Sequence, residues 1–138
     1  MLIKSFLLFF IASGSLIPYY TYFLAIQKCN KKNDYTIHGL WIDYYNRSYP
    51  QFCNNIPFQL EELKELRENL DTNWKSCYSE SIGLWKHEWD KHGTCFYPNM
   101  NLTYYFSKTL ELFNKKQETF NTKCHEKECL IEIDYIEL

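Results

Sequence analysis

The chain has 138 residues, of which 46% are hydrophobic and 19% aromatic, and this composition excludes an intrinsically disordered protein. Its formal net charge of −2 argues against binding a polyanion through bulk positive charge, although a local cationic site remains allowed. The length and the apolar content together predict one packed domain.

The N-terminus has the pattern of a secretory signal peptide. Lys4 supplies a positive charge, residues 5–12 form a short apolar run, and small residues at 13–15 suit a cleavage site. The apolar run is short for a membrane span, and the alternatives are a buried helix or an uncleaved anchor. We expect residues 1–16 to be removed. Residues 17–138 would then form a secreted protein, or one of the endo-lysosomal or vacuolar lumen, without stable membrane association.

The cysteines and the glycosylation motifs fit that compartment. The six cysteines are an even set, which in a secretory context predicts three disulfides, although spacing alone does not fix their pairing. Two Asn-x-Ser/Thr motifs predict glycosylation at Asn46 and Asn101.

Two strands are predicted early in the chain. Tyr19–Gln27 is aromatic and apolar without a breaker, which favours a strand buried on both faces. After a polar turn at residues 30–34, Tyr35–Trp41 predicts a second strand. Its alternation assigns side chains to opposite faces, Thr36, His38 and Leu40 to one and Tyr35, Ile37 and Trp41 to the other. Gly39 inside this strand indicates a bulge or a close backbone approach.

Helices dominate the rest of the sequence. A loop is expected over Asp43–Cys53, and apolar spacing then predicts helices over Gln59–Leu70, Ile82–His92 and Tyr104–Phe113. Gly93 stands at the expected C-cap of the second helix, and Asn101 or Asn99 at the N-cap of the third. Leu130–Ile136 alternates and predicts a closing strand. This order of elements predicts an α+β fold rather than alternating βαβ units.

The segment from His87 to Cys95 concentrates acid–base groups. At about 100° per residue, His87, Glu88, Lys91 and His92 fall within an arc of about 140° on one helix. One helix therefore presents imidazoles, a carboxylate and a cation to the same cleft. Such a grouping suits phosphoryl transfer or acyl chemistry.

Metal and nucleophile chemistries fit the sequence poorly. A zinc-protease helix needs histidines four residues apart, whereas His87 and His92 are five apart. Cys124, His125 and Cys129 resemble a zinc cluster, but a disulfide is the better interpretation in a secreted chain. No serine lies in a Gly-x-Ser-x-Gly motif. A reaction whose nucleophile belongs to the substrate remains, such as attack by the 2′-hydroxyl of RNA, and it needs no metal or cofactor.

Two segments carry a family resemblance. Ile37–Trp41 and Trp85–Cys95, with Tyr49-Pro50 and Cys53 between them, resemble the active-site segments of the RNase T2 family of secreted endoribonucleases. The resemblance implies an antiparallel sheet with several helices packed on it and three disulfides. It also implies cleavage of single-stranded RNA through a 2′,3′-cyclic phosphate, without a metal; it says nothing of a protein partner.

The resemblance also implies roles for individual residues. By position, His92 is the general base and His38 the general acid. Glu88 and Lys91 polarise the phosphate and stabilise the transition state, and His87 helps to bind the phosphate. By the same resemblance, Trp41, Asp43 and Tyr49 match positions of a base pocket that would favour adenine. Plain core or loop packing is the alternative for Trp41 and Tyr49. The family's disulfide pattern implies Cys29–Cys77 and Cys53–Cys95, which leaves Cys124–Cys129.

The sequence also departs from the family pattern. Ile42 replaces a proline, so we expect a less rigid loop at Asp43, and Leu84 replaces an aromatic residue that would stack on a second base. The chain looks shortened between about residues 113 and 124, with loss of helices that back the sheet. For this reason a catalytically inactive, RNase-like secreted effector or binding protein stays open as an alternative.

Overall fold

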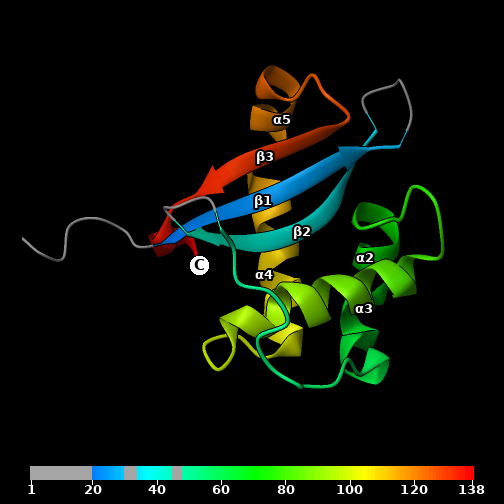
Figure 1. The fold of residues 1–138 in the computed structure, drawn as a ribbon. Coiled ribbons are helices and arrows are strands. Elements are labelled where there is room, and N and C mark those ends of the chain that lie inside the picture. The colour runs from blue at the N-terminus through cyan, green and yellow to red at the C-terminus, as the bar shows by residue number, and fades with distance from the viewer. Residues whose placement is uncertain (1–19, 30–33, 45–47) are drawn as a thin grey trace, which may run out of the picture.

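The structure is a computed structural model that describes residues 20–29, 34–44 and 48–138. A three-stranded antiparallel sheet lies at its centre, with β1 (Tyr20–Lys28) between β2 (Tyr35–Tyr44) and β3 (Glu128–Ile133) (Figure 1). Helices pack against this sheet, which confirms the predicted α+β class. The predicted signal peptide, residues 30–33 of the predicted turn and the glycosylation motif at Asn46 lie outside the described residues.

β1 is the central strand, but its burial is uneven. Leu24, Ala25, Ile26 and Gln27 are buried, whereas Tyr20 at the start of the strand is exposed. Both neighbouring strands pair with the buried half, so its backbone hydrogen bonds are made within the sheet. The prediction of burial on both faces therefore holds for the second half of β1.

A β-bulge at His38 interrupts β2. Ala25 pairs with Gly39, and Ile26 pairs with Ile37, so His38 is an extra residue that faces no partner on β1. Ile37 and Leu40 are both fully buried in the core as a result. The predicted alternation, which set His38 with Leu40 and Ile37 with Trp41, is wrong because it assumed a ladder without a bulge.

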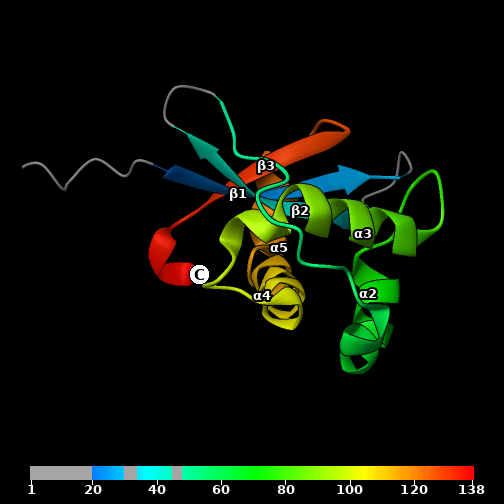
Figure 2. The ribbon, with the colours of Figure 1, turned by 60° about the horizontal axis from the view of Figure 1, so that its bottom comes forward.

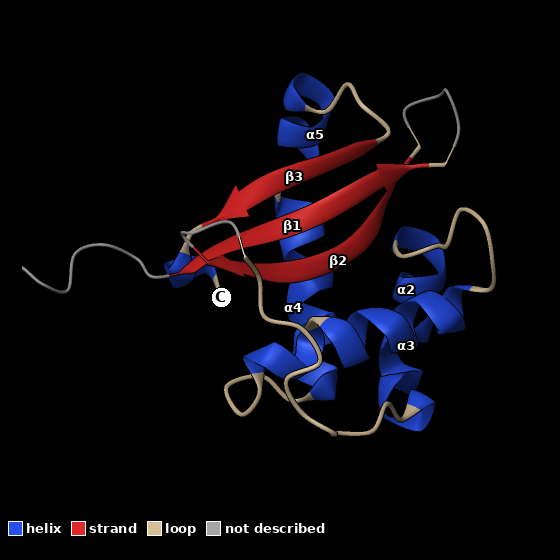
Figure 3. Cartoon of the chain, viewed as in Figure 1, coloured by secondary structure: helices blue, strands red, loops and turns tan. Residues whose placement is uncertain are grey.

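Most helices lie on one side of the sheet or at its β2 edge. In chain order they are η2 (Leu60–Leu66), α2 (Arg67–Asn73), α3 (Ser81–Lys91), η3 (Gly93–Phe96), α4 (Leu102–Lys115), α5 (Gln117–Lys123) and η4 (Tyr135–Glu137), where η marks a 3-10 helix. α4 crosses behind the strands in Figure 3 and lies below them in the turned view of Figure 2, while α3 runs beside β2. Asn101 is the N-cap of α4, and its side chain accepts from the Tyr104 amide at 2.8 Å.

Several predicted boundaries need correction. The predicted helix Gln59–Leu70 is a 3-10 helix followed by α2, and the last strand ends at Ile133, before a further 3-10 turn. Across residues 113–124, where the chain looks shortened, the structure has the end of α4 and the whole of α5. Asp43 and Tyr44, expected in a loop, belong to β2.

Gly93 is not the C-cap of α3. His92 is the C-cap of α3, and no described glycine has a positive φ. A Cβ at Gly93 would lie 2.4 Å from the ring of Trp89, which is far closer than real contacts allow. Close packing of η3 on Trp89, rather than backbone conformation, therefore explains this glycine.

The described cysteines form the pairs that the family resemblance implies. Cys29–Cys77 joins the end of β1 to the loop before α3, and Cys53–Cys95 joins the long loop after β2 to η3. Cys124–Cys129 closes the short connection between α5 and β3.

No helix among the described residues has the length and apolar character that crossing a membrane requires.

Candidate active site

One pocket of about 340 Å³ is lined by all the residues for which the sequence predicted a catalytic or base-binding role. Side chains of all three strands and of α3 bound it. The lining residues are Phe23, His38, Trp41, Ile42, Asp43, Tyr49, His87, Glu88, Lys91, His92 and Leu130. The bulge in β2 and the single face of α3 therefore bring the two sequence segments together.

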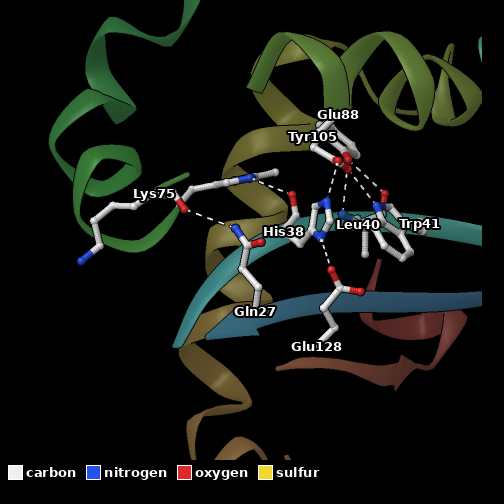
Figure 4. Close-up of polar contacts among 9 residues, drawn as sticks. Gln27, His38, Leu40, Trp41, Lys75, Glu88, Tyr105 and Glu128 are labelled. Carbon is white, nitrogen blue, oxygen red and sulfur yellow. Dashed lines mark hydrogen bonds and ion pairs between the residues drawn. The ribbon is translucent and has the colours of Figure 1, made fainter. Parts of the chain in front are cut away.

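Glu88 links the two segments at the bottom of the pocket. Its side chain is 1% exposed, and its Oε2 accepts a hydrogen bond from Trp41 Nε1 at 2.8 Å (Figure 4). Its Oε1 lies 3.3 Å from His38 Nε2. Gly39 makes this approach possible, because a Cβ there would lie 2.1 Å from Glu88 Oε2. The close approach predicted at Gly39 is thus one between β2 and the carboxylate of α3.

His38 lies between two carboxylates. Glu88 faces its Nε2, and Glu128 of β3 lies 3.9 Å from its Nδ1 (Figure 4). Burial lowers the pKa of His38, but the hydrogen bond to Glu88 and the charges of Glu88 and Glu128 outweigh it, while Lys91 opposes them. The pKa of His38 is therefore raised above its ordinary value, which favours the protonated ring.

His92 has the opposite environment. His92 is 6% exposed, and its ring stacks on Trp41 with centroids 4.9 Å apart. Its Nδ1 is buried and has no hydrogen-bond partner among the described residues. Burial, together with the charges of Lys91, His87 and His38, lowers the pKa of His92 to about 4, against the opposing charge of Glu88. The site thus holds one imidazole that favours a proton and one that favours its neutral form.

The remaining site residues lie around these two rings. Lys91 Nζ lies 5.6 Å from the centre of the Tyr49 ring, and His87 is exposed where α3 borders the pocket. Asp43 Oδ1 is buried and has no hydrogen-bond partner among the described residues. Ile42 pairs with Tyr22 of β1, so the residue that replaces proline continues the strand and no loosened loop carries Asp43.

Two residues that no sequence motif indicated hold the backbone of β2 in the site by hydrogen bonds. The buried hydroxyl of Tyr105 donates to Leu40 O at 3.0 Å and accepts from Leu40 N at 3.3 Å. Burial and the charge of Glu88 raise the pKa of Tyr105 well above its usual value, so the hydroxyl keeps its proton. Trp74 Nε1 donates to His38 O at 2.9 Å. Both residues fix the backbone on either side of Gly39, and in the sequence both look like ordinary core aromatics.

Within the described residues, no group of three or more His, Cys, Asp or Glu side chains is placed to hold a metal ion. Cys124 and Cys129, considered above as zinc ligands, are joined to each other.

Known proteins are similar to the part of the chain that forms this site. The model of the Ribonuclease T2 family matches residues 18–128. A Ribonuclease T2-like protein of Emericella nidulans is 37% identical over 102 residues, which cover 60% of this chain and 24% of that protein. Extracellular ribonuclease LE of Solanum lycopersicum is 38% identical over 87 residues, which cover 59% of this chain and 38% of that protein. The chain therefore spans less than half the length of these relatives.

A solved structure agrees with the fold. RNase NT, crystallised in complex with 5′-AMP, superposes with a TM-score of 0.65 at 26% sequence identity. The superposition covers 77% of this chain and 62% of that one.

Proposed function

Because the chain belongs to the Ribonuclease T2 family, we propose that it is an endoribonuclease that cleaves single-stranded RNA to a 2′,3′-cyclic phosphate. The observation that carries this proposal is the pocket in which His38 and His92 have oppositely shifted pKa values. A pair of titratable groups whose environments separate their pKa values is suited to acid and base roles in one reaction.

His92 takes the role of general base. Its lowered pKa keeps it neutral at mildly acidic pH, so it can remove the proton of the 2′-hydroxyl. Since Nδ1 is buried, Nε2 is the nitrogen that we assign to this transfer. The 2′-oxygen then forms a bond to phosphorus as the bond between phosphorus and the 5′-oxygen breaks.

His38 takes the role of general acid, because its raised pKa keeps a proton available for the departing 5′-oxygen. Lys91 supplies positive charge for the phosphorane-like oxygens, and His87, at the exposed border of the pocket, helps to bind the phosphate. Glu88 orients His38 and Trp41. His92 accepts one proton and His38 donates one, so the step needs no metal or cofactor.

For the base next to the scissile phosphate, we assign recognition to Asp43, Tyr49 and Trp41. Asp43 lines the pocket, and its carboxylate can accept from the exocyclic amine of adenine. Tyr49 is 45% exposed and offers a ring for stacking, whereas one face of Trp41 is already covered by His92. Asp43→Ala, which removes the acceptor, should reduce any preference for adenine in cleavage of matched oligonucleotides; an unchanged preference would reject this assignment.

For the compartment, we propose one domain over residues 17–138, secreted or delivered to an endo-lysosomal or vacuolar lumen after removal of residues 1–16. Three disulfides fit such an oxidising environment. Asn101 is exposed, so we expect glycosylation there as well as at Asn46. N-terminal sequencing of the secreted protein, and a mass shift with glycosidase that Asn101→Gln reduces, would test both.

The experiment is cleavage of single-stranded RNA by the purified chain at mildly acidic pH, beside His38→Ala and His92→Ala. We expect each variant to lose at least about 100-fold in kcat/KM, the lower range for general acid–base catalysis. EDTA should leave the wild-type rate unchanged. If wild type cleaves no faster than the double variant, the enzyme proposal fails and an inactive, RNase-like binding protein becomes the better account.

A further inference from the structure

The second carboxylate beside His38 comes from outside both family segments. Among the described residues, His38 forms ion pairs with Glu88 on α3 and with Glu128 on β3 (Figure 4). The two carboxylates differ in environment, because Glu88 is 1% exposed and Glu128 is 69% exposed. They also approach different nitrogens of the ring, Nε2 and Nδ1 respectively.

The backbone around Glu128 is held in place on the sheet. Glu128 pairs with Gln27 of β1, and the amide of Lys28 donates to Lys127 O at 2.8 Å. The next residue, Cys129, is bonded to Cys124, a sequence separation of only 5. A strand pairing and a disulfide therefore fix the point from which the Glu128 side chain reaches His38.

The strand also fixes the direction of this side chain. Along β3, Ile131 and Ile133 are buried, whereas Glu128, Leu130 and Glu132 are exposed. Leu130 lines the pocket, so the exposed face of β3 is the face that borders the candidate active site. Glu132 thus offers a carboxylate on the same face that forms no ion pair with His38 among the described residues.

We propose that Glu128 is a positioning residue for the reaction, holding the second ring nitrogen of His38 so that the ring keeps one orientation and its proton. This inference rests on the proposed role of His38 as general acid. An imidazolium has two N–H donors. Glu128 lies 3.9 Å from Nδ1 and attracts that side of the ring. The proton on Nε2, which faces Glu88 at 3.3 Å, is the one that we assign to transfer to the 5′-oxygen.

Charged groups other than Glu128 also shift the pKa of His38. Glu88 favours the protonated ring, as Glu128 does, whereas Lys91 and burial disfavour it. His92 lies across Trp41 from His38 and interacts with it electrostatically. Because Glu128 is exposed, its pair with His38 adds little to folding stability, and its effect should be visible in the titration of His38.

The test is an NMR titration of the His38 ring in wild type, Glu128→Gln and the matched control Glu132→Gln. Both variants remove one charge from an exposed position on the same face of β3. We expect Glu128→Gln to move the His38 midpoint to lower pH, and the alkaline limb of kcat/KM to move in the same direction. Glu132→Gln should leave both in place, and Glu128→Asp should restore part of the shift.

Two results would overturn the inference. One is an unchanged His38 midpoint in Glu128→Gln, and the other is an equal shift in both Gln variants, which would indicate a general charge effect. The titration needs no turnover, so it separates the two proposals. A specific shift in a protein that does not cleave RNA would support the contact and reject the enzyme.

Discussion

Substitution of Gly39 by alanine is the sharpest test of how the site is built. The added Cβ would lie 2.1 Å from Glu88 Oε2, 2.6 Å from Trp41 Nε1 and 3.0 Å from Glu88 Cδ. Glu88 Oε2 and Trp41 Nε1 form the hydrogen bond that joins the two segments of the candidate site. Since Gly39 does not have a positive φ, backbone strain contributes nothing to the expected effect.

The magnitude follows from what must move. Overpacking a buried site costs about 1–3 kcal/mol, and loss of a hydrogen bond to a charged group costs about 1.5–3 kcal/mol. Because the two costs overlap, we expect Gly39→Ala to lower the free energy of unfolding by about 3 kcal/mol. Displacement of Glu88 also moves His38, and a misplacement of about 1 Å can cost about 100-fold in rate.

The assay is chemical denaturation combined with kcat/KM on RNA, with Gly83→Ala as control. Nothing lies within 4 Å of a Cβ at Gly83, which is in α3. Alanine there should stabilise the helix by about 0.5–1 kcal/mol and leave the rate unchanged. If Gly39→Ala stays within about 0.5 kcal/mol of wild type, the size of an ordinary surface substitution, and keeps full activity, the described approach of β2 and α3 is wrong.

Other predictions concern pH and stability. The rate should fall as the pH drops through about 4, because His92 then gains a proton. It should also fall as the pH rises above the pKa of His38, which is raised above its ordinary 6.5, because His38 then loses its proton. A pH profile with both limbs near 6.5 would contradict this. Replacing Cys53 and Cys95 with serine, a sequence separation of 42, should lower the free energy of unfolding by about 4 kcal/mol in urea denaturation. Asn101→Ala should cost about 1 kcal/mol by loss of the α4 cap, and no loss would reject the capping bond.

The helical half of the site could be predicted because helix periodicity is local. The spacing of His87, Glu88, Lys91 and His92 places them on one face, and all four line the pocket. His38 could be joined to them only through the family resemblance, because the pairing of distant segments is not visible in spacing.

The strand half was predicted less well, and the bulge explains why. One extra residue reverses which side chains face the core, so a regular alternation misplaced His38 relative to Leu40. Gly39 carried the signal of an irregularity but not its position. Glu128 and Tyr105 could not be predicted, since their contacts depend on how β3 pairs with β1 and how α4 packs on β2.

The central claim is that the 2′-hydroxyl of the RNA attacks phosphorus, with His92 as general base and His38 as general acid in one pocket. The most direct measurement compares two oligonucleotides that differ only by a 2′-deoxy substitution at the scissile position. The all-RNA strand should be cleaved and should carry a 2′,3′-cyclic phosphate end, and the substituted strand should stay intact at that position. Cleavage of both strands at the same position, or product ends without the cyclic phosphate, would contradict the account.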